Sequence, residues 1–408
     1  MIVRFSHIRA AVALFFAISL CSGIPSLSLA ASGDTEITGF VGIEYRAFQH
    51  AASFPGQRRD SLSAVAQLEL FHQRPDGKNS FLFIPYARID EYDEKRTHFD
   101  IRELQWTHVG EDWELLAGIS KVFWGVTESV HLVDIINQTD MVDRFDTEAK
   151  LGQPMIKYTL VKDWGDLSFF VLPGFRERTF QSDEGRLRTP FPVAERTEYA
   201  SSAEQSHVDF AIRYVGTFGD IDVGLSHFSG TSREPRLRPG LNEDGMPVLI
   251  PRYDTIDQTG LDLQATKDEW LYKLELITRS GFGDRYTAAV AGFEYTFTGV
   301  MKSNADLGVL FEYLYDDRNE SATTFFEDDV FLGARLALND AASTELLFGV
   351  IFDVDSSERI YSVEGNRRIG ENMKLEIEAR LFSNVGITEQ LTSLRNDDFV
   401  QMSLNYFY

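Results

Sequence analysis

Residues 125–151 combine carboxylates with apolar side chains in a way that suggests a role in binding or screening solutes. The stretch holds several Val, Leu, Ile and Phe residues between its acids, which is unusual for a purely solvated loop. Carboxylates confined near one another attract cations. The charged residues expected to act in this way are Glu128, Asp134, Asp140, Asp143, Arg144 and Asp146, with Glu148 and Lys150 close behind them. In the alternative interpretation these acids face solvent or cap a short helix.

The same segment offers one weak pattern for metal binding. Glu128, His131 and Asp134 follow each other at three-residue spacing, which would place them on one side of a helix. A single histidine among loop acids is a poor ligand set, however. The sequence has no Gly-rich phosphate loop, no Gly-x-Ser-x-Gly motif and no cysteine cluster. We therefore predict that the protein is not an enzyme and uses no metal or other cofactor.

The first thirty residues read as a signal peptide. Arg4 and Arg9 supply a basic start, residues 10–20 are apolar but too few to span a bilayer, and small residues precede a predicted cleavage after Ala30. Leu20 before Cys21 argues against lipoprotein processing. Cleavage would remove the only cysteine, so the mature chain needs no disulfide.

Composition narrows the class of protein further. The formal net charge is −24, and removal of the two arginines of the signal peptide leaves 37 basic against 63 acidic residues, or −26. Such a chain repels nucleic acid. It is 43% hydrophobic and 13% aromatic, which is too much for a disordered acidic tail. No run of eighteen apolar residues follows position 30, so the sequence predicts no membrane-spanning helix.

Alternation with a period of two runs through almost the whole mature chain. In residues 373–381, for example, every second side chain is apolar and those between are charged. The runs last about 11–14 residues, whereas strands of soluble sandwiches average about five or six. We predict strands at 36–48, 61–73, 79–91, 98–109, 112–124, 152–163, 165–175, 206–218, 220–230, 254–267, 269–281, 285–299, 303–316, 326–338, 343–355, 357–369, 372–383 and 396–408.

These strands predict a closed barrel. In hydrocarbon every backbone donor and acceptor must be satisfied within the protein, and a sheet achieves this by closing on itself. Short turns alternate with long connections, as expected for short periplasmic turns and longer outer loops. Residues 31–408 are therefore expected to form one all-β domain, a transmembrane antiparallel up-and-down barrel of about 18 (16–18) strands. Pro85 and Pro173 fit this only at bulges or strand ends.

A barrel of this size leaves an aqueous interior. Few residues precede the first strand, so we expect outer loops rather than an N-terminal plug to narrow it. Basic residues on the polar faces are predicted to point inward: Arg46, Arg88, Arg213, Arg335 and Arg380. Acids on the same faces include Glu44, Glu275, Glu312, Glu345, Glu376 and Glu378. These acids and bases could produce an electric field across the lumen, or they could simply form ion pairs with each other along its wall.

Two segments resemble a known family. The chain ends with apolar residues at alternate positions, which looks like the assembly signal of outer-membrane proteins, although phenylalanine is the more usual last residue: Val400, Met402, Leu404, Tyr406 and Tyr408. Residues 125–151 follow the fifth strand and resemble the third outer loop of Gram-negative porins, which folds into the lumen. Phe123-Trp124-Gly125, followed by Asp134-Ile-Ile-Asn137 and Asp140, resembles a run in uncharacterised porin-like families.

The resemblance implies a channel in the bacterial outer membrane for passive diffusion of small hydrophilic solutes, with ion transport that prefers cations if the acids of 125–151 line the constriction. It also implies contact with outer-membrane lipid and lipopolysaccharide, insertion by the barrel-assembly machinery, and homotrimers as one assembly. Two alternatives stay open. One is a specific channel for an anionic saccharide or organic acid, and the other is a closed structural or adhesive barrel that binds a partner through its outer loops.

Overall fold

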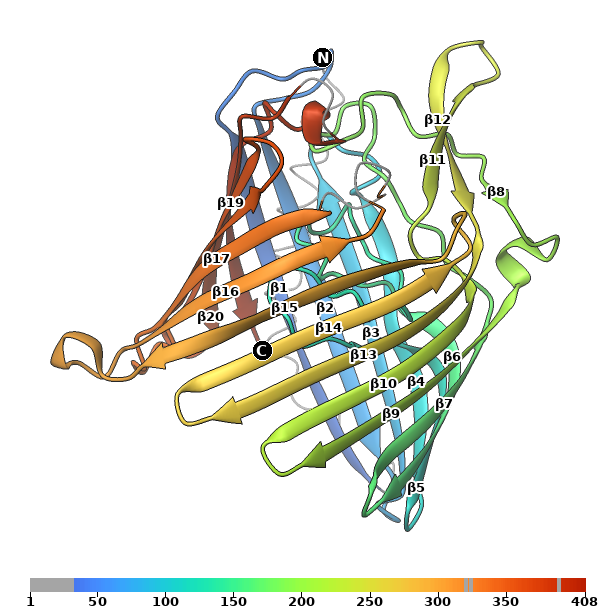
Figure 1. The fold of residues 1–408 in the computed structure, drawn as a ribbon, viewed down its shortest axis with the longest axis vertical. Helices are drawn as coiled ribbons and strands as arrows, with labels where there is room; N and C mark the ends of the chain where they lie inside the picture. Colours follow the sequence, from blue (N-terminus) through green and yellow to red (C-terminus); the bar gives the residue numbers. More distant parts are fainter. Residues whose placement is uncertain (1–32, 319–321, 323–325, 387–389) are drawn as a thin grey trace.

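The computed structural model describes residues 33–318, 322, 326–386 and 390–408. Eighteen long strands form one antiparallel sheet that closes on itself (Figure 1). The predicted all-β barrel of about 18 strands is thus confirmed. None of the helices in the described ranges is long and apolar enough to span a membrane. The predicted signal peptide, residues 1–30, lies outside the described residues.

The barrel strands follow one another around the wall in chain order. They are β1 (Asp34–Phe48), β2 (Asp60–Gln73), β3 (Asn79–Asp90), β4 (His98–Val109), β5 (Trp113–Ser120), β6 (Gln153–Lys162), β7 (Gly165–Pro173), β9 (Val208–Phe218), β10 (Ile221–Thr231), β13 (Thr255–Lys267), β14 (Trp270–Ser280), β15 (Tyr286–Phe297), β16 (Asp306–Asp316), β17 (Asp328–Ala337), β18 (Glu345–Asp353), β19 (Arg359–Ile369), β20 (Met373–Ser383) and β21 (Phe399–Phe407). β1 pairs with β2 on one side and with β21 on the other, so neither is a free edge.

The observed strand bounds follow the alternation closely, with one clear exception. β5 ends at Ser120, whereas the sequence predicted a strand to residue 124, because residues 121–124 leave the wall and enter the lumen segment described below. Pro85 lies at a register shift between β3 and β4, and Pro173 is the last residue of β7. Both prolines therefore occupy the irregular positions that a missing N–H requires.

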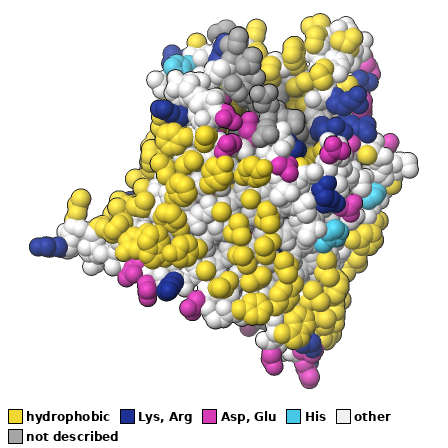
Figure 2. All heavy atoms as spheres, viewed as in Figure 1, with side chains coloured by type: hydrophobic (Ala, Val, Ile, Leu, Met, Phe, Trp, Pro, Cys, Tyr) yellow, Lys and Arg dark blue, Asp and Glu magenta, His cyan; other side chains and the backbone are white. Residues whose placement is uncertain are grey.

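The outer face of the barrel is apolar. Leu225, Leu261 and Leu276 lie side by side on β10, β13 and β14, and Leu225 is 48% exposed. Figure 2 shows such side chains gathered in a broad band over the strands. The other face carries buried polar residues such as Asp262 and Glu275, together with the apolar residues on which a loop packs from inside. This arrangement suits lipid outside and water inside.

Aromatic rings collect where the short turns lie. Trp270 has ring centroids of Tyr272, Phe293 and Tyr295 within 4.7–5.8 Å, and Trp164 stacks on Tyr214 near the β6–β7 turn. Amphipathic rings of this kind occupy the boundary between hydrocarbon and water. We infer that this ring cluster marks one membrane interface.

The C-terminal strand has the alternation that the sequence predicted. Val400, Met402, Tyr406 and Tyr408 are 39–48% exposed on the outer face, while Gln401 is buried on the inner one. Leu404 pairs with Ile43 of β1 at the closure of the barrel. Whether the assembly machinery reads this strand stays a prediction.

A second, small sheet stands on the side of the long loops (Figure 1). It consists of β8 (Glu198–Tyr199), β11 (Arg236–Leu241) and β12 (Pro247–Tyr253). The parent segments, 176–205 and 231–253, lie between predicted strands and were expected to be loops. β8 is only two residues long, and β11 with β12 forms a hairpin too short to separate from loop sequence by periodicity.

An arginine on the lipid face should weaken the barrel. We expect Leu225→Arg to lower the free energy of unfolding in lipid vesicles by about 2–4 kcal/mol, because the charge enters hydrocarbon. Gln264→Arg on the polar face of β13, where the structure places Asp222 opposite, should cost far less. Denaturant titrations of both variants test this, and equal stability of the two would contradict the assignment of faces.

Candidate functional site

Residues 121–152 leave the wall after β5 and return to it at β6. The amide side chain of Asn137 fixes the base of this lumen segment. Its Nδ2 donates to the carbonyls of Ser120 and Leu151, both at 2.9 Å, and its Oδ1 accepts from the N–H of Val122 at 2.9 Å. The two ends of the segment are thereby held together, and everything between them projects away from the β5–β6 edge.

Apolar packing explains the hydrophobic residues of the lumen segment. Val133 and Ile136 are fully buried, and Trp124 is 4% exposed. These side chains share one cluster with inner-face residues of the wall, including Phe170 of β7 and Ile277 of β14. Each buried aliphatic side chain of this size contributes about 1.5–3 kcal/mol when removed from water. The segment is therefore packed against the inside of the barrel.

Two buried glutamates on the wall hold the tip of the segment. Glu275 of β14 accepts hydrogen bonds from the N–H groups of Val126, Thr127 and Val133 at 2.7–3.1 Å and from the Thr127 hydroxyl at 2.7 Å. Its side chain is fully buried. Several backbone donors around one carboxylate satisfy a charge that burial would otherwise make costly.

Glu312 of β16 repeats this arrangement. It accepts from the N–H groups of Glu128 and Ser129 at 2.7 and 2.8 Å, and from the Ser129 hydroxyl at 2.5 Å. The segment therefore crosses the lumen from β5 to β14 and β16. The sequence showed both glutamates as inward-facing acids. Their role as anchors depends on the path of the lumen segment, which alternation does not reveal.

All five acids predicted to shape a constriction have basic partners. The ion pairs are Glu128–Arg335 at 2.6 Å, Asp134–Lys150 at 3.0 Å, Asp140–Arg102 at 2.7 Å, Asp143–Arg88 at 2.8 Å and Asp146–Arg144 at 3.0 Å. Most of these acids bind the segment to the wall or to itself. The positive charges of these partners therefore largely neutralise the five carboxylates.

Asp143 pairs with two arginines of the wall, Arg88 at 2.8 Å and Arg102 at 3.5 Å. Burial by itself would raise the pKa of its carboxyl, but the charges of Arg88 and Arg102 outweigh burial and hold this pKa at about 2. Arg96, from the connection after β3, joins the same network through Glu44 and through Asp90 at 2.8 Å. Sequence reasoning missed Arg96 and Arg102.

The five predicted lumen arginines all lie on the inner side of the wall and all have partners there. Arg46 donates to Gln401 at 2.7 Å, Arg88 and Arg335 bind the lumen segment, Arg213 pairs with Asp262 at 2.8 Å, and Arg380 donates to Glu364 at 2.5 Å. Arg46, Arg213 and Arg380 thus have partners along the wall, as one of the two interpretations of the sequence proposed, whereas Arg88 and Arg335 also pair with the lumen segment.

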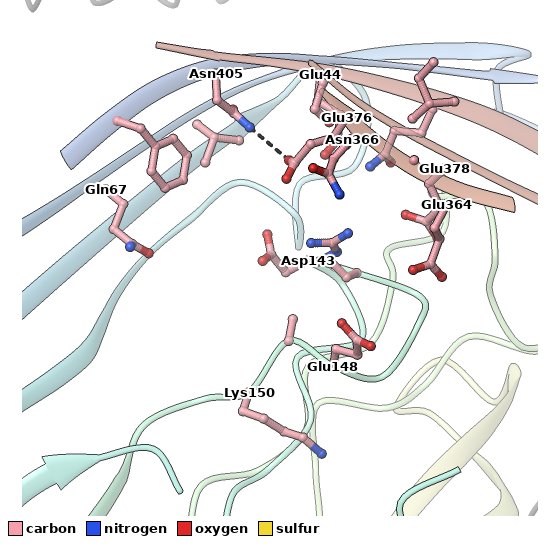
Figure 3. Close-up of a pocket in the computed structure, with 18 of the residues that line it drawn as sticks. Glu44, Gln67, Asp143, Glu148, Lys150, Glu364, Asn366, Glu376, Glu378 and Asn405 are labelled. Atoms are coloured by element: carbon pink, nitrogen blue, oxygen red, sulfur yellow. Dashed lines mark hydrogen bonds between the residues drawn. The ribbon is translucent and has the colours of Figure 1, made fainter. Parts of the chain in front are cut away.

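A cavity of about 600 Å³ remains between the lumen segment and the wall formed by β17–β21 and β1–β4 (Figure 3). Glu128, Asp143 and Arg144 from the predicted set line it, and Asp134, Asp140 and Asp146 do not. Arg88 and Arg335 line it as well, whereas Arg46, Arg213 and Arg380 do not. Further acids on its surface are Glu148 of the segment and Glu44, Glu345, Glu364, Glu376 and Glu378 of the wall.

Glu148 shows how acidic this cavity is. Burial raises the pKa of its carboxyl, and the negative charges of Asp146 and Glu364 raise it further. Figure 3 shows Glu148 on the lumen segment facing the wall that carries Glu364 and Glu378. The acidic side of the cavity is thus built mainly by residues outside the predicted constriction set.

Removing the Glu275 anchor should loosen the tip of the segment. In Glu275→Ala the N–H groups of Val126, Thr127 and Val133 lose their acceptor, and we expect their hydrogen exchange to accelerate at least tenfold. Glu345→Gln is the matched control, because Glu345 accepts a hydrogen bond from the neighbouring-strand amide of Asn366 and, among the described residues, none from the lumen segment. Unchanged exchange in Glu275→Ala would show that the anchor is not needed.

Comparison with known proteins shows which solved structures have a similar fold. No protein-family model and no curated protein sequence matches the chain. OccK3 (OpdO) of Pseudomonas aeruginosa is similar in structure, with a TM-score of 0.52 and 12% identity over 92% of this chain and 95% of that one. OmpT, an outer-membrane protein of Vibrio cholerae, gives 0.48 and 11% identity, and a mutant porin of Rhodopseudomonas blastica gives 0.43 and 10%. Each covers 92% of this chain and 100% of its own. The chain has a porin-like barrel fold.

Proposed function

We propose that the protein is a channel of the bacterial outer membrane through which small hydrophilic solutes diffuse passively. The observation that carries this proposal is the polar cavity of about 600 Å³ inside a closed 18-stranded barrel. A barrel of that size encloses water unless something fills it, and here the lumen segment fills part of the cross-section and leaves the cavity beside it. The cavity is the passage in this proposal.

The passage should prefer cations. Acids outnumber bases on its surface, and five of the six bases that line it (Arg88, Arg102, Arg144, Lys150 and Arg335, but not Lys121) are engaged in ion pairs. Carboxylates without a bound base leave a negative potential that favours permeant cations. In this proposal the preference comes from Glu148 and the wall glutamates, more than from the paired acids of the lumen segment.

The membrane setting rests on several features together. The outer face is apolar, the sequence has a signal peptide pattern with predicted cleavage after Ala30, and the C-terminal strand resembles an assembly signal. We propose residence in the Gram-negative outer membrane in contact with lipid and lipopolysaccharide, after insertion by the barrel-assembly machinery. A homotrimer is part of the same proposal.

The two alternatives have less support. A channel specific for an anionic saccharide or organic acid needs basic groups free to meet it, and each of the five predicted lumen arginines already has a partner. A closed adhesive barrel would use the sheet of β8, β11 and β12, which stands clear of the wall (Figure 1). The open cavity favours the channel.

Planar-bilayer recordings test the channel and its preference. Folded protein should carry ion current, and the reversal potential in a salt gradient should report cation preference. Asp143→Asn should shift that potential toward anions, because it removes one negative charge from the cavity surface and leaves Arg88 and Arg102 each with one carboxylate partner fewer. Asp257→Asn removes the same charge from the outer face and should leave it unchanged. Folded protein without current would exclude the proposal.

A further inference from the structure

Four glutamates crowd one side of the cavity. Glu364 and Glu378 are direct cross-strand neighbours on β19 and β20, and Glu376 is two residues further along β20. Glu148 faces this wall from the lumen segment (Figure 3). Like charges placed opposite each other destabilise a sheet. The arrangement therefore calls for positive charge between them.

The nearby bases supply only part of that charge. Arg380 donates to Glu364 at 2.5 Å, Lys374 donates to Glu376 at 2.8 Å, and Arg144 pairs with Asp146 at 3.0 Å. Among the residues that the structure describes, no base donates a hydrogen bond to the side chain of Glu148 or Glu378. Within the described part of the chain Glu148 has no ion pair, and Glu378 has only the Arg380 guanidinium at 3.7 Å, which donates its hydrogen bond to Glu364 instead.

Glu378 is the second and independent sign of a ligand. Its side chain is 4% exposed, and neither carboxylate oxygen has a hydrogen-bond partner within the described part of the chain. Arg380 Nη2 lies 3.7 Å from Oε1, which is beyond hydrogen-bond distance. Buried polar atoms are almost always satisfied, so at the edge of a cavity the missing donors would come from water or from a bound group.

We propose that Glu378, Glu364 and Glu148 form a binding site for an organic cation, a solute that carries a primary ammonium or guanidinium group. This inference rests on the proposed channel and names the class of solute that its passage selects. An ammonium group has three donors and no acceptor, so it complements carboxylates whose oxygens lack donors.

The surroundings fit a polyatomic solute better than a bare ion. The cavity of about 600 Å³ is in the range of small-molecule sites. Beside the glutamates it offers the amides of Asn366, Gln401 and Asn405 and the apolar side chains of Phe40 and Leu347. Such a lining can hold the carbon skeleton and the neutral polar groups of a solute while the carboxylates hold its charge.

A site inside a passage must also release its solute. Binding has to be favourable enough for entry and weak enough for exit, so millimolar rather than nanomolar affinity suits a conducting site. Glu148 belongs to the segment and Glu378 to the wall, so the solute would lie between the two sides of the passage.

Calorimetry on detergent-folded protein tests the site directly, with 1,4-diaminobutane as the probe. Wild-type protein should bind it saturably. Glu378→Gln and Glu148→Gln should each weaken binding about tenfold, because each removes one charged acceptor. Asp222→Asn, which removes an equal charge on the inner face of β10 near the short turns, should bind like wild type. Glu148 is outside the wall strands, so its variant tests the site even if Glu378→Gln does not fold.

Bilayer recordings separate failure of the site from failure of the channel. Wild-type current should be blocked reversibly by 1,4-diaminobutane, and the block should weaken in both glutamate variants. Normal current with neither block nor binding would refute the site and leave the channel standing. Saturable binding without any current would refute the channel and leave the site standing. Equally tight, competing binding of magnesium chloride would overturn the assignment to an organic cation.

Discussion

The structure depends on the rule that a backbone donor or acceptor shielded from water must find a partner. In the wall this rule closes the sheet, because β1 pairs with β21 as well as with β2 and no edge faces lipid. Closure then determines the polarity of the two faces of the sheet. One must be apolar for lipid, and the other encloses a lumen in which charged side chains are tolerated because water or other charges surround them.

The lumen segment obeys the same rule with different partners. It has almost no regular secondary structure, so its N–H groups at 126–129 and 133 cannot bond along a ladder, and Glu275 and Glu312 accept them instead. A carboxylate can accept several donors at once, so two side chains hold the whole tip. The apolar cluster around Val133 and Ile136 adds affinity, and the glutamates determine where the tip lies.

The alternating strands of the barrel could be predicted from the sequence. The contacts of the lumen segment could not, because they depend on the path that this one segment takes across the lumen. Alternation located the strands because each residue of a wall meets lipid or lumen regardless of its neighbours. The end of β5 was misplaced because Phe123 and Trp124 are as apolar as a strand would be, although Trp124 packs inside the lumen. Likewise Arg102 and Asp140 lie 38 residues apart, and no periodicity relates them.

The same limit explains why counting acids gave an incomplete view of the lumen charge. Asp140 and Asp143 add to the formal charge of the segment, yet Arg102 and Arg88 cancel them locally, and what a solute meets is the charge left after pairing. Glu378 shows the converse, because it is one acid among several in the sequence and becomes distinctive only through burial without a donor. In the proposed channel, selectivity therefore depends on the few charges that the fold leaves without a hydrogen-bonded base, and these are set by the path of the lumen segment across the wall.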